Sequence, residues 1–240
     1  MNKLKVLVAC EESQRVCMAF RELGHEAYSA DIQEPSGGHP EWHILGDVLG
    51  VLNPKENHIC FNTMDGTSHD IPKWDIIIAH PPCTYLTNSG NRWFNIEKYG
   101  DKARERHRLR EEAVEFFMEF VKADCDHISI ENPVGCMSTR YRKPNQIIQP
   151  YEYGHPERKQ TCLWTKDLPN LKPTNIVEPV IIKLASGKTD SPWHIETLSL
   201  PPAERAKARS KTFQGIADAI AKQYSEYVIE KIKEKKESQD

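Results

Sequence analysis

The chain has 240 residues, of which 38% are hydrophobic, enough for one good core but with little room for a second full domain. Its 32 lysine and arginine residues nearly balance 35 aspartate and glutamate residues, and the formal charge of -3 excludes a global field that attracts nucleic acid. Any contact with a polyanion must therefore be local. The seven cysteines include no CxxC pair and no Cys/His ligand spacing, which indicates free thiols and predicts no metal site.

Strands and helices alternate through the first part of the chain. Residues 4–9 are a short β-branched run, and a helical pattern follows, with apolar residues on one face: Val16, Ala19, Phe20 and Leu23. Gly24 can end this helix, after which residues 25–30 are typical of a second strand that closes on Asp31. The spacing is that of one βαβ unit and predicts parallel strands.

Further strands are expected in the middle of the chain. A third strand is weakly indicated at residues 42–45, whereas residues 74–79 are a near-continuous apolar run, typical of a central parallel strand. Apolar residues at helical spacing over 113–121 then lead to a short strand at 127–130, which ends at Glu131. This alternation predicts an α/β fold with a doubly wound, mostly parallel sheet.

The C-terminal part is less regular. Residues 143–209 are richer in proline, although 161–164 and 180–184 could each be strands. A last helix is predicted from Gln214 to about Lys233, and residues 231–240 alternate charges without apolar anchors, as in a flexible tail. The sequence has no membrane-spanning apolar stretch and no signal-peptide pattern. We therefore expect a single domain over residues 1–240, located in the cytoplasm and without a membrane partner.

Residues that directly follow strands are the candidates for a site, because open parallel sheets bind ligands beyond the carboxyl ends of their strands. Four such residues have useful chemistry: Glu11, Asp31, Cys83 and Glu131. An acidic residue after the second strand can accept hydrogen bonds from ribose hydroxyls, which suits Asp31. A strand-ending aspartate is as often a simple turn residue.

The sequence His-Pro-Pro-Cys at residues 80–83 is the sharpest feature. Two prolines stiffen the exit of a buried strand and hold Cys83, whose thiolate is a strong nucleophile, at the edge of the sheet. A lone free cysteine is more often a small buried hydrophobe. Glu131, at the end of the expected neighbouring strand, places a carboxylate within reach of Cys83 and favours catalysis.

These ordered motifs resemble the cytosine-5 DNA methyltransferase family. Pro82-Cys83 is similar to the family's nucleophile loop, and Glu131-Asn132 is similar to its Glu-Asn dipeptide on the next strand. Residues 154–164, which include Arg158, resemble the later arginine motif, and residues 214–217 resemble the last motif. The resemblance covers scattered parts of residues 75–224. It implies a Rossmann-like fold of the S-adenosylmethionine-dependent methyltransferases.

The resemblance also implies a reaction, the transfer of a methyl group from S-adenosylmethionine to carbon 5 of cytosine in DNA. Attack of the Cys83 thiolate on carbon 6 would create an enamine that takes the methyl group. Glu131, protonated or sharing a proton with ring nitrogen 3, would stabilise the charge pushed into the ring, and Arg158 would support the base.

Binding residues are implied in the same way. The expected cofactor contacts are Cys10, Glu11, Asp31, Asp47 and Pro81. The expected substrate contacts are Pro82, Asn132, Arg140 and Arg142. The last two belong to a basic cluster just beyond Glu131, which makes this cluster the better candidate for binding phosphates.

Two departures from the family pattern keep other functions open. The first loop, residues 9–14, has no glycine, which also fits a catalytically silent binding protein. Residues 165–209 form a short insertion in place of a recognition domain, so we expect weak sequence discrimination, a partner protein or a homodimer. RNA or nucleotide pyrimidines as substrates, and an amino-group DNA methyltransferase with a Pro-Pro-aromatic loop, remain alternatives.

Overall fold

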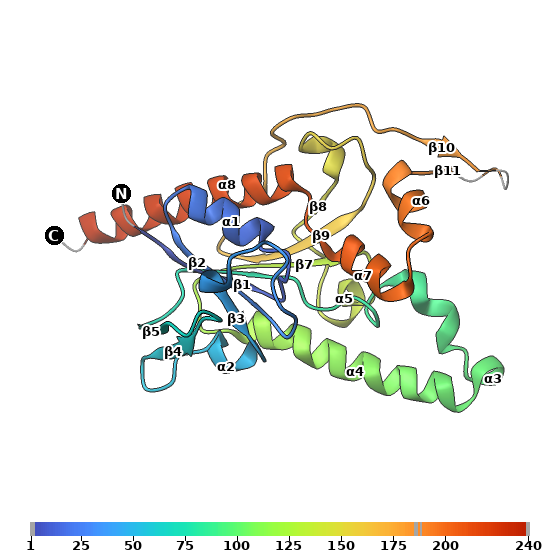
Figure 1. Ribbon diagram of the computed structural model, residues 1–240, viewed down its shortest axis with the longest axis horizontal. Coiled ribbons are helices and arrows are strands. Elements are labelled where there is room, and N and C mark those ends of the chain that lie inside the picture. The colour runs from blue at the N-terminus through green and yellow to red at the C-terminus, as the bar shows by residue number, and fades with distance from the viewer. Residues whose placement is uncertain (1–2, 185–186, 188, 239–240) are drawn as a thin grey trace.

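A seven-stranded sheet forms the centre of the computed structural model, which describes residues 3–184, 187 and 189–238 (Figure 1). The spatial order of the strands is β3-β2-β1-β6-β7-β9-β8. Their bounds are β1 Lys5–Ala9, β2 Glu26–Asp31, β3 His43–Leu45, β6 Ile76–Ala79, β7 His127–Pro133, β8 Gln146–Ile148 and β9 Thr161–Lys166.

The prediction of a mostly parallel α/β sheet is confirmed. Strands β3, β2, β1, β6 and β7 are parallel to one another, whereas β9 is antiparallel to both of its neighbours, β7 and β8. The chain builds β1, β2 and β3 outward on one side, then crosses to place β6 on the other side of β1. In doubly wound sheets such a reversal is the point where ligands bind, so the loops after β1 and β6 are the first place to look for a site.

Helices cover both faces of the sheet, which explains the near-continuous apolar strands. On one face, Val6 and Val8 of β1 pack in a core with α1 (Arg15–Glu22) and α8 (Gln214–Glu237). On the other face, Leu7 and Ala9 belong to a core that contains Phe117 of α4 (Asp101–Lys122). The alternation of neighbouring β1 residues between two cores follows from the period of two in a strand.

Of the expected insertion at 165–209, residues 165 and 166 belong to β9, and the described residues beyond them lie outside the central sheet. The insertion contains a two-stranded ribbon, β10 (Ile182–Lys183) with β11 (Thr189–Asp190), and two helices, α6 (Pro192–Leu198) and α7 (Pro202–Ser210). The possible strand at 180–184 is thus reduced to two residues. In Figure 1 the ribbon, α6 and α7 lie at the same end of the molecule as α3 (Ile96–Tyr99) and the first turns of α4.

Smaller elements complete the fold. They are α2 (Leu49–Leu52), α5 (Met137–Arg140), the hairpin of β4 (Ile59–Asn62) and β5 (Ser68–Ile71), and three 3-10 helices, η1 (Pro40–Trp42), η2 (Asn88–Phe94) and η3 (Pro150–Glu152). None of the helices in the described ranges has the length and apolar character needed to cross a membrane.

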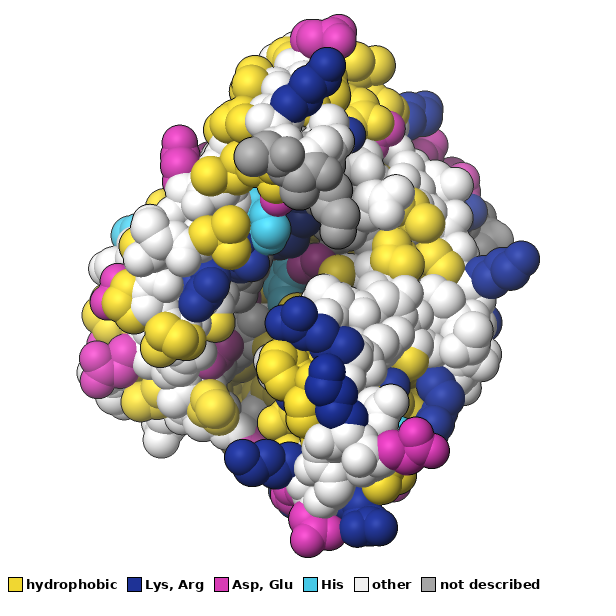
Figure 2. Space-filling model, turned by 90° about the vertical axis from the view of Figure 1, so that its right-hand side faces the viewer, with side chains coloured by type: hydrophobic (Ala, Val, Ile, Leu, Met, Phe, Trp, Pro, Cys, Tyr) yellow, Lys and Arg dark blue, Asp and Glu magenta, His cyan; other side chains and the backbone are white. Residues whose placement is uncertain are grey.

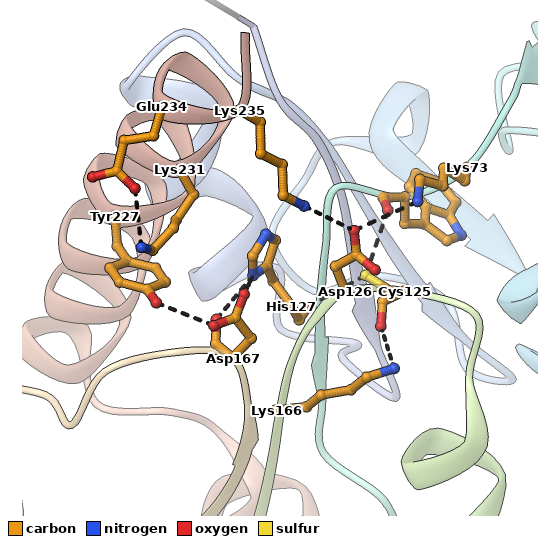
Figure 3. Close-up of polar contacts among 11 residues, drawn as sticks. Lys73, Cys125, Asp126, His127, Lys166, Asp167, Tyr227, Lys231, Glu234 and Lys235 are labelled. Carbon is orange, nitrogen blue, oxygen red and sulfur yellow. Dashed lines mark hydrogen bonds and ion pairs between the residues drawn. The ribbon is translucent and has the colours of Figure 1, made fainter. Parts of the chain in front are cut away.

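The last helix is longer than predicted, because α8 continues to Glu237. Polar contacts hold it against the amino end of β7 (Figure 3). Tyr227 Oη donates a hydrogen bond to Asp167 Oδ1 at 3.1 Å, and Lys235 Nζ lies 3.7 Å from Asp126 Oδ2. Residues 239–240 of the expected tail lie outside the described residues, and the flexibility of the tail stays a prediction.

Candidate active site

The loop after β6 meets β7 near the carboxyl edge of the sheet through a buried pair of side chains. His80 Nδ1 donates a hydrogen bond to Glu131 Oε2 at 2.8 Å. The side chain of His80 is 9% exposed and that of Glu131 is 15% exposed. Sequence analysis selected Glu131 as the residue after a strand and passed over His80. In the structure β7 continues to Pro133, so Glu131 lies within this strand, whereas His80 directly follows β6, the parallel neighbour of β7.

The electrostatics of this pair favour an ion pair. Burial disfavours a charged imidazole, but the hydrogen bond to Glu131, its charge and that of Glu11 together raise the pKa of His80 above its ordinary value. Burial opposes ionisation of Glu131 as well, yet the hydrogen bond from His80 and the charge of Lys159 lower the pKa of its carboxyl. The lowered pKa favours the ionised form of Glu131, and the raised pKa favours a proton on His80, which makes His80 the candidate source of the proton that the expected role of Glu131 requires. The other imidazole nitrogen, His80 Nε2, is buried and has no hydrogen-bond partner among the described residues.

Cys83 lies next to this pair and is accessible to solvent. Its carbonyl accepts hydrogen bonds from the amides of Leu86 and Thr87, both at 3.0 Å, so the cysteine opens a tight turn. Partial desolvation raises the pKa of the Cys83 thiol, the charge of Glu131 raises it further, and the charge of Lys159 opposes both effects. The resting side chain is thus a neutral thiol beside a carboxylate.

A second contact fixes the nucleophile loop against β7. Asn132 is buried, and its Nδ2 donates a hydrogen bond to the carbonyl of Pro81 at 2.7 Å. Asn132 therefore positions the loop through Nδ2, while its buried Oδ1 has no hydrogen-bond partner among the described residues, and its contact with a substrate stays a prediction. Pro81 is buried too, whereas Pro82 is exposed beside Cys83, where a substrate can reach it.

The loops after β6 and β7 also touch through their backbones. The amide of Cys136 donates to the carbonyl of Leu86 at 2.8 Å. A Cβ atom built on Gly135 would lie 2.0 Å from that same carbonyl oxygen, so only glycine permits this approach. Gly135 is a further residue that sequence analysis missed.

The expected catalytic arginine is not brought to Cys83 or Glu131. Arg158 is exposed, and its Nη2 donates to Thr189 Oγ1 of β11 at 3.2 Å. The next residue, Lys159, takes the place beside the pair, because it lines the same small cavity as His80 and Glu131. Lys159 Nζ is held by the carbonyl of Arg209 at 3.0 Å.

The basic cluster after β7 is engaged in contacts within the protein. Arg140 forms an ion pair with Glu111 of α4. Arg142 donates from Nη1 to Asn145 Oδ1 at 2.6 Å and from Nη2 to the carbonyl of Thr165 at 3.0 Å. The structure therefore does not support the expectation that this cluster is free to bind phosphates.

The loop after β1 is built without glycine. Cys10 adopts the left-handed backbone region with φ 59°, and its amide donates to the carbonyl of Ala30 at 2.7 Å. Glu11 is buried and accepts hydrogen bonds from the amides of Val16 at 2.7 Å and Cys17 at 3.1 Å. Its carboxylate thus satisfies the first turn of α1 and is not available to a ligand.

Two aspartates gather around Cys10. Burial raises the pKa of the Cys10 thiol, and the charges of Asp31 and Asp47 raise it further. Asp31 Oδ1 accepts from the amide of Gln33 at 2.9 Å, as in a turn, and leaves Oδ2 without a protein donor in the described ranges. The neighbouring Ile32 is 79% exposed, the largest exposed fraction among the exposed large apolar side chains described.

Glu12 is the least satisfied group of this edge. It is buried, and neither carboxylate oxygen has a hydrogen-bond partner among the residues described. The nearest cation is Lys207 of α7, whose Nζ lies 3.4 Å from Oε2. A buried carboxylate with so little compensation is costly unless a positively charged group meets it.

A large cleft adjoins the Cys83 loop, and it has a volume of about 910 Å³. Its lining combines residues 84–93 with the first turns of α4 and with α7. Figure 2 shows this side of the molecule as a hollow with histidine and acidic side chains at its floor and lysine and arginine side chains on its rim. Within the described ranges no group of three or more His, Cys, Asp or Glu residues could hold a metal ion.

Comparisons with known proteins leave the family open. No family model matches the chain, and no curated protein matches it. Among solved structures, a methyltransferase of Entamoeba histolytica, EhMeth, is similar with a TM-score of 0.42 and 14% identity over 76% of this chain. The match covers 59% of that protein. This similarity assigns no family.

Proposed function

We propose that the chain transfers a methyl group from S-adenosylmethionine to carbon 5 of cytosine in DNA, with Cys83 as the nucleophile. The observation that carries the proposal is the buried His80–Glu131 pair beside the accessible thiol of Cys83. A nucleophile and an acid that holds a proton are the two groups that activation of a pyrimidine ring requires.

The loops after β1, β2 and β3 carry side chains that fit the cofactor. Asp31 Oδ2 is free to accept hydrogen bonds from ribose hydroxyls, and exposed Ile32 offers an apolar surface to an adenine ring. Asp47, exposed after β3, can accept from an exocyclic amine. Buried Glu12 has no hydrogen-bond donor among the described residues and only Lys207 as an ion-pair partner, so its carboxylate can also meet the ammonium of an amino acid. When bound, S-adenosylmethionine supplies an electrophilic methyl group on a sulfonium.

The chemical role of the pair follows from its protonation. Cys83, which is accessible to solvent, loses its proton to water and forms a bond to carbon 6, which pushes electrons of the ring toward nitrogen 3. Glu131 Oε1 accepts no hydrogen bond within the described residues, so it can face that nitrogen while Oε2 holds His80. A proton then passes from His80 through Glu131 to the ring, and Lys159 keeps the carboxylate charged between turnovers.

The ring is restored in reverse order. Once carbon 5 carries the methyl group, it loses its proton to water, and the bond between Cys83 and carbon 6 breaks. The proton on nitrogen 3 returns through Glu131 to His80. Cys83 leaves carbon 6 as a thiolate and takes a proton back from water, so that each residue ends in the state in which it started, as turnover requires.

The experiment is transfer of labelled methyl groups from S-adenosylmethionine to DNA, RNA and free nucleotides in parallel. We expect label in DNA, recovered as 5-methylcytosine after digestion, and no label with Cys83→Ala. Label on the exocyclic amine of a base would contradict the proposal and favour an amino-group methyltransferase. Label in RNA or nucleotides alone would move the same ring chemistry to another substrate.

A further inference from the structure

The side chains that line the cleft beside Cys83 carry a net positive charge, whereas the protein as a whole carries a net negative charge. Four cations line the cleft, Lys102, Arg106, Arg205 and Arg209, while the whole chain carries a formal charge of -3. Its one acidic residue, Glu105, is already bound by Arg108 Nη2 at 2.6 Å and Nε at 2.9 Å. The cleft is therefore a local exception that suits a polyanion.

Two of these cations are free to bind phosphates. Lys102 and Arg205 have no ion-pair or side-chain hydrogen-bond partner in the part of the chain that the structure describes, and they project from α4 and α7. The other two cations are held by hydrogen bonds within the protein. Arg106 Nη2 donates to the carbonyl of Thr84 at 3.2 Å, and Arg209 Nε donates to Thr197 Oγ1 at 2.8 Å. Free cations thus lie on two different helices that line the cleft.

Aromatic side chains line the same cleft. Trp93 is 42% exposed, and its ring lies 5.0 Å from that of Tyr99 at an angle of 46°. Tyr85, two residues after Cys83, is the third aromatic of the lining. Aromatic faces beside a basic groove are what proteins use to stack unpaired bases while cations follow the backbone. Bases inside a duplex do not offer their faces in this way.

We infer that this cleft binds a single strand of DNA next to the target cytosine, with a neighbouring base stacked on Trp93 and phosphates on Lys102 and Arg205. The inference rests on the proposed function, because it takes DNA from that proposal. The cleft volume of about 910 Å³ suits a short unpaired stretch of strand. Its continuity with the Cys83 loop explains how recognition proceeds without a separate domain.

The test is a binding titration of the full chain, without cofactor, against labelled oligodeoxynucleotides followed by fluorescence anisotropy. We expect the single strand to bind about tenfold or more tightly than the duplex of the same sequence. Trp93→Ala should weaken single-strand binding roughly five- to a hundredfold, and Trp93→Phe should restore most of it. Equal binding of duplex and single strand, or tighter binding of RNA, would overturn the inference.

Salt dependence tests the cations separately. Removing both free cations with Lys102→Ala and Arg205→Ala should lower the slope of log affinity against log salt by about 1.4, since each phosphate contact on a single strand contributes about 0.7. The matched control is Lys122→Ala, which removes a lysine from the far end of the same helix α4. A slope that changes as much in the control as in the double variant would refute the assignment.

The binding measurement can be interpreted independently of catalysis. Cys83→Ser should bind the single strand like the parent while transferring no methyl groups. If the parent methylates cytosine but the cleft variants bind normally, the inference fails and the proposed function stands. If the cleft variants lose binding while the parent methylates no nucleic acid, the cleft is supported and the proposed reaction fails.

Discussion

Asn132 donates to the carbonyl of Pro81 at 2.7 Å, directly beside the strand-end residue Glu131. This bond ties the loop of the nucleophile to the strand of the carboxylate, so the two groups cannot move apart without breaking it. Together with the close approach of Gly135 to Leu86, it makes the loops after β6 and β7 a single rigid unit. Catalytic geometry depends on supports of this kind.

Cys83→Ala should abolish the covalent complex with substrate. DNA that contains 5-fluorocytosine should trap the parent in a complex that resists denaturant, because fluorine at carbon 5 cannot leave as a proton does. The complex is measured by denaturing gel electrophoresis. Cys136→Ala, at another partly exposed cysteine near the site, is the control and should still form it. Equal trapping by Cys83→Ala would mean that another nucleophile acts.

Glu131→Gln should reduce turnover by about a hundred- to ten-thousandfold, the usual contribution of an acid-base group. Cofactor affinity should stay nearly unchanged, because the proposed role of Glu131 is on the substrate ring. Turnover is measured by methyl transfer and affinity by titration calorimetry. A variant that retains at least half of the parent turnover would reject this role.

His80→Gln should change the pH profile as well as the rate. Because the pKa of His80 is raised, the parent keeps its proton donor to a higher pH than a free imidazole would, and it should lose activity as the pH rises through that pKa. The variant has no such group, so its residual activity should continue to rise with pH as Cys83 ionises. If the activity of the variant falls at alkaline pH in the same way as that of the parent, another residue causes this fall.

The same pair should make stability depend on pH. A pKa raised from 6.5 in the folded state means that His80 contributes stability fully below about pH 6.5 and loses it as the pH rises through the folded value. Melting temperatures of the parent and His80→Gln, measured across this range, should therefore differ most at low pH and converge at high pH. A constant difference would indicate loss of packing alone.

Two adjacent cations provide a matched comparison. Lys159→Met removes the charge beside Glu131 and should lower kcat/KM by roughly ten- to a hundredfold, in the range for a contact to a charged group. Arg158→Met removes an exposed side chain that contacts Thr189 and should stay within about twofold of the parent. The reverse order of effects would return the catalytic role to Arg158.

Asp31→Ala should weaken cofactor binding by about 1.5–3 kcal/mol, the range for hydrogen bonds to a charged group. Asp126→Ala is the control, because Asp126 precedes β7 and lies at the opposite edge of the sheet. Titration with S-adenosylmethionine measures both. Unchanged affinity in a folded Asp31 variant would leave this side chain only its turn hydrogen bond to Gln33.

The fold could be predicted because its signals are local. Continuous apolar runs and helical spacing identify β1, β6, α1 and α4, which bury their residues in two cores. Strand β8 has only three residues and was missed, since so short a segment leaves no period to recognise. The sequence pattern of β9 also does not indicate that this strand is antiparallel, because its direction is set by its pairing with β7.

The site could be predicted only in part. Cys83 lies in the loop after β6 and Glu131 lies near the carboxyl end of β7, and the parallel pairing of these strands brings them together. Lys159 was missed because it precedes a strand, and the antiparallel pairing of Thr161 with Pro133 is what carries it to the carboxyl edge. His80 was taken only as part of a stiff turn, and its partner became visible through side-chain geometry alone.

Helix α7 faces two binding surfaces at once, since Lys207 reaches Glu12 while Arg205 and Arg209 line the cleft. On the proposed function, a cofactor ammonium at Glu12 would compete with Lys207, which belongs to the same helix as two cations of the cleft. Cofactor and DNA would then be linked ligands, and each would change the affinity of the other by the same factor. A segment too short to be a recognition domain would thereby couple the binding of the two substrates.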